Sequence, residues 1–152
     1  MQATVRTSHG EFVFELDADA SPKAVESFAD LARDGFFEGT IFHRIVPGFV
    51  IQGGDPQGTG TGGPGYTTVD TPAAETTYAR GTVAMAKKAD DPPGAAGSQF
   101  FVVTAEDAGL PPEYAVIGRV TEGLDVVLRI GELGDQSQRP TERVEIRSLT
   151  VE

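Results

Sequence analysis

The sequence predicts an all-β-dominated chain, a closed eight-stranded antiparallel β-barrel capped by two α-helices. About eight short stretches carry strand-like apolar runs or alternation, and only two stretches have the apolar spacing of a helix. One helix follows the second strand and the other precedes the last, which is not a regular alternation of strands and helices. The 19 glycines and 10 prolines add many turns. A closed barrel with a helix over each end would bury both helical stripes and leave no sheet edge.

The chain is expected to form one domain over residues 1–152. An apolar fraction of 39% and a charged fraction of 23% are typical of globular domains and argue against extensive disorder. No repeat, linker or low-complexity segment divides the sequence. A single core is therefore predicted.

Composition excludes several classes of function. The net charge of −11 disfavours nucleic acid as a partner, since no cluster of basic residues is longer than Lys87-Lys88. The absence of cysteine excludes disulfides, thiolate catalysis and cysteine-based zinc sites. No apolar run approaches the roughly 20 residues of a membrane span, and the N-terminus lacks a signal pattern. We expect a cytoplasmic monomer whose charge confers solubility.

The first part of the chain predicts a hairpin and a helix. Residues 3–8 and 11–17 form the hairpin, with His9 interpreted as a turn residue. Ser21 before Pro22 predicts the N-cap and first position of a helix. The helix has an apolar stripe and a glycine stop, formed by Val25, Phe28, Leu31 and Ala32 and by Gly35.

The segment from Phe42 to Asp55 predicts two strands that meet at a Pro47-Gly48 turn. A glycine-rich loop, residues 58–65, follows. It superficially resembles a phosphate-binding loop, but no Lys-Ser/Thr pair and no helix come after it. The alternative is a loop whose glycines let the backbone approach another segment or a ligand closely.

The second half of the chain predicts four further strands and a helix. Three strands are expected within residues 81–88, 97–104 and 114–120. Thr121 is the predicted N-cap of the second helix, whose apolar residues are Leu124, Val127, Leu128 and Ile130. In the last strand the apolar phase changes between Ile146 and Leu149, which indicates a β-bulge near Arg147-Ser148.

Arg44 is the residue that requires an explanation. An unpaired charge in a core is very costly, so a strand that carries an arginine is expected to turn it toward a cleft. His43 precedes it and, as its neighbour in the strand, should point to the opposite face. We therefore interpret His43 as structural.

Four sequence blocks, in order, identify a resemblance. The run FHRIVPGFVIQGGD from Phe42 to Asp55 closely resembles the defining segment of the cyclophilins, which are peptidyl-prolyl cis-trans isomerases (rotamases). Residues 60–63 (GTGG), 85–86 (MA) and 97–101 (GSQFF) resemble further blocks of that family. The resemblance extends over essentially the whole chain and implies the same eight-stranded barrel with two capping helices.

The resemblance also implies a groove on the outside of the barrel that binds proline-containing segments of unfolded or folded proteins and assists protein folding, as a chaperone does. It implies catalytic roles for Arg44, Phe49 and Gln52, with no metal and no cofactor. The residues that it implies for substrate binding are Val50, Gly60, Ala86, Lys87, Gln99, Phe101, Leu110 and Tyr114.

Four positions depart from the family pattern. Val50 stands where many relatives have Met, Lys87 where Asn is common, and Tyr114 where His is common. Gly109 occupies a position where many eukaryotic relatives have a Trp associated with cyclosporin binding, so cyclosporin sensitivity is not expected. The alternative to an enzyme is a non-catalytic module that binds proline segments, and the presence of Arg44 favours the enzyme.

Overall fold

The computed structural model describes residues 1–152 and contains ten strands and two helices. The strands are β1 (Gln2–Thr7), β2 (Gly10–Leu16), β3 (Arg44–Val46), β4 (Val50–Gly53), β5 (Thr68–Val69), β6 (Thr82–Met85), β7 (Ala95–Ala96), β8 (Phe100–Val103), β9 (Val116–Glu122) and β10 (Ile146–Val151). The helices are α1 (Pro22–Arg33) and α2 (Leu124–Ile130). Neither helix has the length and apolar composition needed to cross a membrane.

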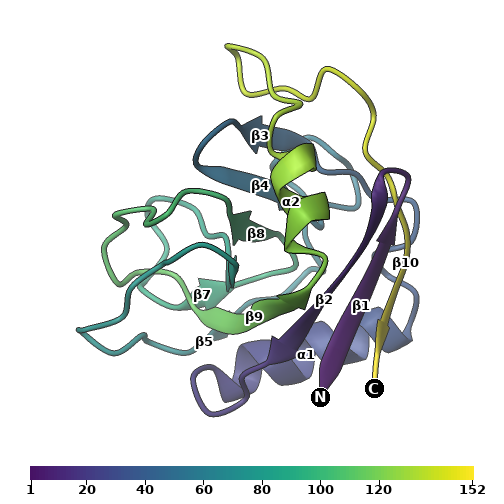
Figure 1. Ribbon diagram of the computed structural model, residues 1–152. Helices are drawn as coiled ribbons and strands as arrows, with labels where there is room; N and C mark the ends of the chain where they lie inside the picture. The colour runs from purple at the N-terminus through teal and green to yellow at the C-terminus, as the bar shows by residue number, and fades with distance from the viewer.

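Eight strands form one antiparallel sheet in the order β10-β1-β2-β9-β6-β8-β4-β3. The sheet curls into a half-barrel, with α1 across one end and α2 near the other (Figure 1). The remaining strands, β5 and β7, pair as a two-residue ladder that the sequence did not predict. The count of eight main strands and two helices is thus confirmed.

The predicted closure of the barrel is wrong. The edge strands β3 and β10 do not pair with each other. The segment before β3 instead contacts the start of β10 through the isolated bridge Ile41–Glu145 and three main-chain hydrogen bonds of 2.8 to 3.0 Å, from Gly39 to Ile146, from Ile146 to Thr40 and from Phe42 to Val144. The outer edge of β3 is already occupied, since the Ile45 N–H donates to the Gln138 carbonyl oxygen at 3.0 Å. The segment around Gln138 therefore accepts a hydrogen bond from β3 that a neighbouring strand would accept in a closed barrel.

Alternation along β4, β6 and β8 gives the sheet two apolar faces. Residues on the inner face join the main core, with Ile51, Met85 and Phe100 almost fully buried. Their neighbours Val50, Ala84 and Phe101 point outward and pack around the buried Tyr78. Because successive side chains of a strand point to opposite faces, these three short strands contribute residues both to the main core and to the outer cluster around Tyr78.

Aromatic side chains join α1 to the sheet. Phe28 lies with its ring centroid 5.7 Å from that of Phe14, 4.9 Å from that of Phe37 and 5.7 Å from that of Phe100. Ser21 precedes the helix as predicted but makes no side-chain cap. The Asp70 carboxylate instead accepts the N–H of Ala24 at 2.7 Å and that of Lys23 at 3.3 Å, a contact that local sequence could not predict.

The β9–α2 junction differs from the prediction. β9 continues through Thr121 to Glu122, so Thr121 is a strand residue and the predicted N-cap is wrong. The helix begins after Gly123, which has a φ of 78°. A Cβ at Gly123 would collide with the main-chain oxygen of Glu11, so close packing against β2 requires glycine here.

The predicted β-bulge in the last strand is confirmed. Arg6 pairs with Ser148 while Thr7 pairs with Ile146, which leaves Arg147 as the extra residue. The bulge restores a buried position for both Ile146 and Leu149.

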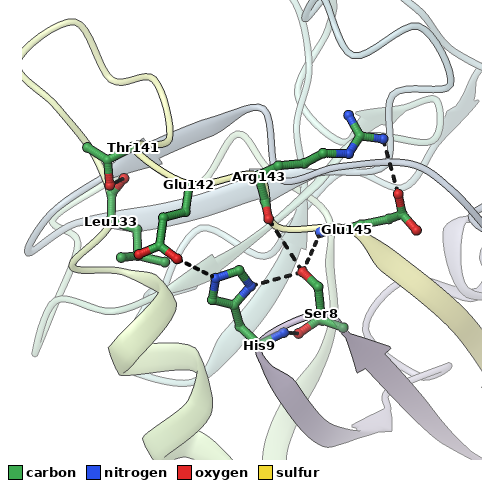
Figure 2. Close-up of polar contacts among 8 residues, drawn as sticks. Ser8, His9, Leu133, Thr141, Glu142, Arg143 and Glu145 are labelled. Atoms are coloured by element: carbon green, nitrogen blue, oxygen red, sulfur yellow. Dashed lines mark hydrogen bonds and ion pairs between the residues drawn. The ribbon is translucent and has the colours of Figure 1, made fainter.

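The β1–β2 turn is fastened to the segment before β10, as Figure 2 shows. The Ser8 hydroxyl oxygen accepts the Glu145 N–H at 3.0 Å and lies 2.9 Å from Nδ1 of His9. His9 Nε2 lies 3.2 Å from a carboxylate oxygen of Glu142. His9 is a turn residue, as predicted, and it also anchors the segment that leads from α2 to β10.

Asp55 organises the glycine-rich loop after β4. Its side chain is fully buried, and its carboxylate accepts the main-chain N–H groups of Gln57, Thr59, Gly60 and Gly62 at 2.6 to 3.2 Å. A Cβ at Gly62 would collide with that carboxylate, which confirms close backbone approach as the role of a glycine in this loop. Burial raises the pKa of Asp55, but the four N–H donors together outweigh it and lower the pKa below its usual value.

Replacing Asp55 should therefore cost stability in a pH-dependent way. Above the unfolded-state pKa of about 3.9 the carboxylate is charged and its four bonds contribute fully; the contribution is lost as pH falls through the lower folded-state pKa. Asp55→Asn should lower the free energy of unfolding by about 1–3 kcal/mol at pH 7, since its amide group would face N–H donors. The difference from wild type should shrink below about pH 4.

Urea unfolding at several pH values measures this effect. The matched control is Asp90→Asn, because Asp90 is exposed and its carboxylate accepts no hydrogen bond. A loss of stability for Asp55→Asn that is equal at pH 7 and pH 3 would contradict the prediction.

Candidate active site

A cavity of about 420 Å³ opens on the outer face of the sheet. β4, β6 and β8 and the loops that follow them supply most of its wall. Its lining residues are His43, Arg44, Phe49, Val50, Gln52, Thr59, Gly60, Ala86, Lys87, Phe101, Leu110 and Tyr114. Ten of the eleven residues that the sequence predicted for the site lie here, the exception being Gln99.

Gln99 lines a second cavity of about 420 Å³ beside the first. The two cavities share part of their walls, formed by Gln52, Gly60, Ala86 and Lys87. Residues 60–65 of the glycine-rich loop also line the second cavity. The predicted residues thus line two adjoining cavities.

Arg44 is held by two amide side chains. β3 and β4 pair Arg44 directly with Gln52, and Nη1 of Arg44 donates to Oε1 of Gln52 at 3.1 Å. Nε of Arg44 donates to Oε1 of Gln138 at 2.8 Å. The hydrogen-bonded network continues from Gln52 to the glycine-rich loop. Nε2 of Gln52 donates to Oε1 of Gln99 at 3.1 Å, and Nε2 of Gln99 donates to the Gly62 carbonyl oxygen at 3.0 Å.

The first cavity also has an apolar wall. Phe101 and Val50 are buried, while Phe49 and Leu110 pack partly exposed against the same cluster. The ring of Tyr114 lies edge-on to that of Phe101, with centroids 5.5 Å apart. Arg44 and this apolar surface thus line the same cavity, and the electrostatic effect of a charge is stronger beside low-dielectric apolar groups than in bulk water.

Tyr78 fixes the position of Tyr114. Its hydroxyl donates to the Tyr114 carbonyl oxygen at 2.7 Å and accepts the Tyr114 N–H at 3.0 Å. Burial raises the pKa of Tyr78, so the hydroxyl keeps its proton and serves both bonds.

The Lys87 side chain is buried and its ammonium group binds to other groups of the protein. Its Nζ lies 3.2 Å from a carboxylate oxygen of Glu113 and donates to the carbonyl oxygens of Lys88 and Asp91, each at 3.3 Å. Only 4% of the side chain is exposed. The main-chain N–H of Lys87 has no partner within the chain, so the backbone at this position remains available.

His43 lines the same cavity as Arg44, so the prediction that it faces the opposite side is wrong. It precedes β3, outside the regular alternation, and its Nδ1 is buried without a hydrogen-bond partner. Burial lowers the pKa of His43, and Arg44 lowers it further against the opposing effect of Asp55. A neutral imidazole at neutral pH fits a structural role beside the arginine.

Three residues of the site were missed by sequence reasoning. Tyr78 and Asp55 support the walls, and Gln138 bonds the arginine directly. Asp55 is the last residue of the Phe42–Asp55 motif, but nothing in the neighbouring sequence predicts that its carboxylate is buried. Tyr78 and Gln138 lie in irregular segments, where no periodicity indicates which way a side chain points.

Comparison with known proteins agrees with the geometry. The family model of the cyclophilin type peptidyl-prolyl cis-trans isomerases matches residues 2–151. Peptidyl-prolyl cis-trans isomerase B of Bacillus subtilis is 46% identical over 113 residues, 74% of this chain and 77% of the relative. The peptidyl-prolyl cis-trans isomerase of Helicobacter pylori is 40% identical over 131 residues, 84% of this chain and 78% of the relative.

A solved structure shares the fold. A cyclophilin type peptidyl-prolyl cis-trans isomerase of Cryptosporidium parvum, crystallised in the presence of the dipeptide Ala-Pro, superposes with a TM-score of 0.91 at 32% identity. The match covers 100% of this chain and 99% of that one. The sequence blocks, the curled sheet and these relatives lead to one conclusion: the chain belongs to the cyclophilin-type family and is a peptidyl-prolyl cis-trans isomerase.

Proposed function

We propose that Arg44 is the group that accelerates rotation about the X-Pro bond. Rotation breaks amide resonance against a barrier of about 20 kcal/mol. A turnover of about a thousand per second requires the barrier to fall by roughly 7 kcal/mol. This needs no covalent or acid–base step, only tighter binding of the twisted amide than of either planar form.

The observation that carries the proposal is the placement of the Arg44 guanidinium, held by two glutamines at the rim of an apolar cavity. In the twisted amide the prolyl nitrogen becomes pyramidal and regains a lone pair that can accept a hydrogen bond. Arginine is a donor that stays charged at any working pH. Its interaction with that nitrogen exists only near the transition state, which is where an interaction raises the rate.

The other residues bind and orient the substrate. Phe49, Phe101 and Leu110 enclose the prolyl ring and lower the local dielectric around the arginine. Gln52 positions Arg44 through the bond described above. The backbone at Ala86 and Lys87 binds the residue before proline, and the chain preceding it lies over the second cavity beside Gln99 and Gly60.

We propose proline-containing segments of unfolded or folded proteins as substrates, and assistance to protein folding as the role of a cytoplasmic monomer. The dipeptide Ala-Pro used with the Cryptosporidium relative supports a proline-containing ligand. The net charge of −11 disfavours nucleic acid as an alternative partner.

Arg44→Ala tests the assignment. We expect kcat/KM for a proline-containing peptide to fall about 100-fold or more, the size of effect seen when one donor to a transition-state charge is removed. Affinity for the peptide should stay within a few-fold of wild type, because the apolar cavity is unchanged. A protease-coupled assay measures the rate and calorimetry the affinity. Equal rates for the two proteins would contradict a catalytic role for Arg44, and equal rates that do not exceed the uncatalysed rate would instead indicate a non-catalytic module that binds proline segments.

The rate should be nearly independent of pH from about 6 to about 9. Arg44 stays charged over this range, and the proposed step uses no group that gains or loses a proton. His43, which lines the same cavity, has its pKa lowered by burial and is neutral at neutral pH. NMR exchange spectroscopy measures kcat/KM without a coupling protease whose own activity varies with pH. A sigmoidal profile with a midpoint near 7 would contradict the proposal and point to acid–base catalysis.

A further inference from the structure

The loop of residues 134–140, which we name the Gln138 loop, is rigidly built although it contains no regular structure. It runs from the end of α2 toward β10 and lies close to β3 (Figure 1). At its base, the N–H of Thr141 donates to the Leu133 carbonyl oxygen at 2.6 Å and the Thr141 hydroxyl to the same oxygen at 3.0 Å, and Figure 2 shows the two residues side by side. Gly134 and Pro140 form an isolated bridge.

Asp135 holds the interior of the loop. Its carboxylate accepts the Ser137 hydroxyl at 2.7 Å, the Ser137 N–H at 2.8 Å and the Arg139 N–H at 3.0 Å. The bond from the Ser137 hydroxyl and the N–H of Arg139 lower the pKa of Asp135, which keeps the carboxylate charged at neutral pH. The residue between these anchors, Gln138, is therefore fixed in its backbone.

The Gln138 loop is docked on the strand that carries Arg44. The Ile45 N–H donates to the Gln138 carbonyl oxygen at 3.0 Å. A Cβ at Gly134 would collide with the Ile45 carbonyl oxygen, so the loop approaches β3 as closely as glycine permits. Main-chain contacts thus set the distance from Gln138 to Arg44 independently of either side chain.

Gln138 also has an unfavourable backbone conformation. Its φ of 68° makes it the one non-glycine residue of the chain in the left-handed region. Such conformations persist where the surroundings impose them, and they concentrate at functional sites. The residue with this conformation makes the shorter of the two hydrogen bonds to Arg44. The distance from Nε of Arg44 to Oε1 of Gln138 is 2.8 Å, whereas the distance from Nη1 of Arg44 to Oε1 of Gln52 is 3.1 Å.

We propose that Gln138 is a positioning residue for the isomerase reaction, one that fixes the plane of the Arg44 guanidinium before substrate binds. A guanidinium is planar, so acceptors on two of its nitrogens define both its position and its orientation. Gln52 alone leaves the group free to turn about one bond. With both acceptors in place, the remaining N–H donors of Arg44 stay free for the prolyl nitrogen. The inference rests on the proposed role of Arg44.

Two substitutions test the inference. Gln138→Met keeps the length of the side chain but lacks the amide acceptor, and Gln138→Gly removes the side chain and relieves the positive φ. In both, kcat should fall about 3- to 10-fold, because the arginine must be ordered during each turnover, while KM stays within about 2-fold. Gln138→Gly should not lower the melting temperature.

The matched control is Gln136→Gly. Gln136 is the same residue type in the same loop, is exposed, and makes no side-chain hydrogen bond, so its replacement should leave kcat unchanged. An equal loss of kcat in Gln136→Gly and Gln138→Gly would assign the effect to the loop as a whole and overturn the inference.

A direct readout is the Nε–H resonance of Arg44 in ¹⁵N NMR of the free protein, assigned by its absence in Arg44→Lys. It should be sharp in wild type and shift or broaden in Gln138→Met. If wild type is active, Arg44→Ala is inactive and both Gln138 variants turn over at the wild-type rate, the inference fails while the role of Arg44 stands. Equal activity of wild type and Arg44→Ala would remove the role of Arg44 and the inference together.

Discussion

The alternation of side chains along β4, β6 and β8 is the constraint on which the site depends. Each of these strands places alternate residues in the main core and on the outer face. Ile51 and Phe100 bind the sheet to α1 through the aromatic core, while Val50 and Phe101 form the apolar wall of the cavity. The same hydrophobic burial that stabilises the fold therefore also sets the geometry of the groove, and neither can change without the other.

Holding an arginine beside that wall is the second requirement. A charge next to apolar surface loses hydration, and the loss is tolerable only if other groups accept its hydrogen bonds. Gln52 and Gln138 supply neutral acceptors, so Arg44 is held without being neutralised by a carboxylate. A carboxylate partner would have held the group more strongly but would have offset its positive charge.

Much of the site could be predicted because its residues belong to contiguous motifs. Arg44, Phe49 and Gln52 lie within one strand–turn–strand segment, where pairing and the Pro47-Gly48 turn determine which residues face each other. Their catalytic and binding roles stay predictions. A local rule failed at Thr121, which is a good N-cap residue and yet lies within β9, because its neighbours Val120 and Glu122 both pair with β2.

Local sequence determined the eight main strands, the two helices, the bulge at Arg147 and the strand–turn–strand segment that carries Arg44, because hydrophobic periodicity and turn chemistry act over a few residues. Three features were decided by contacts between segments that are far apart in the chain. The half-barrel stays open because Gln138 occupies the edge of β3, helix α1 is capped by Asp70, and Tyr114 is held by Tyr78. In each case the two bonded residues are more than 30 positions apart in the sequence, and hydrophobic periodicity does not predict contacts over such separations.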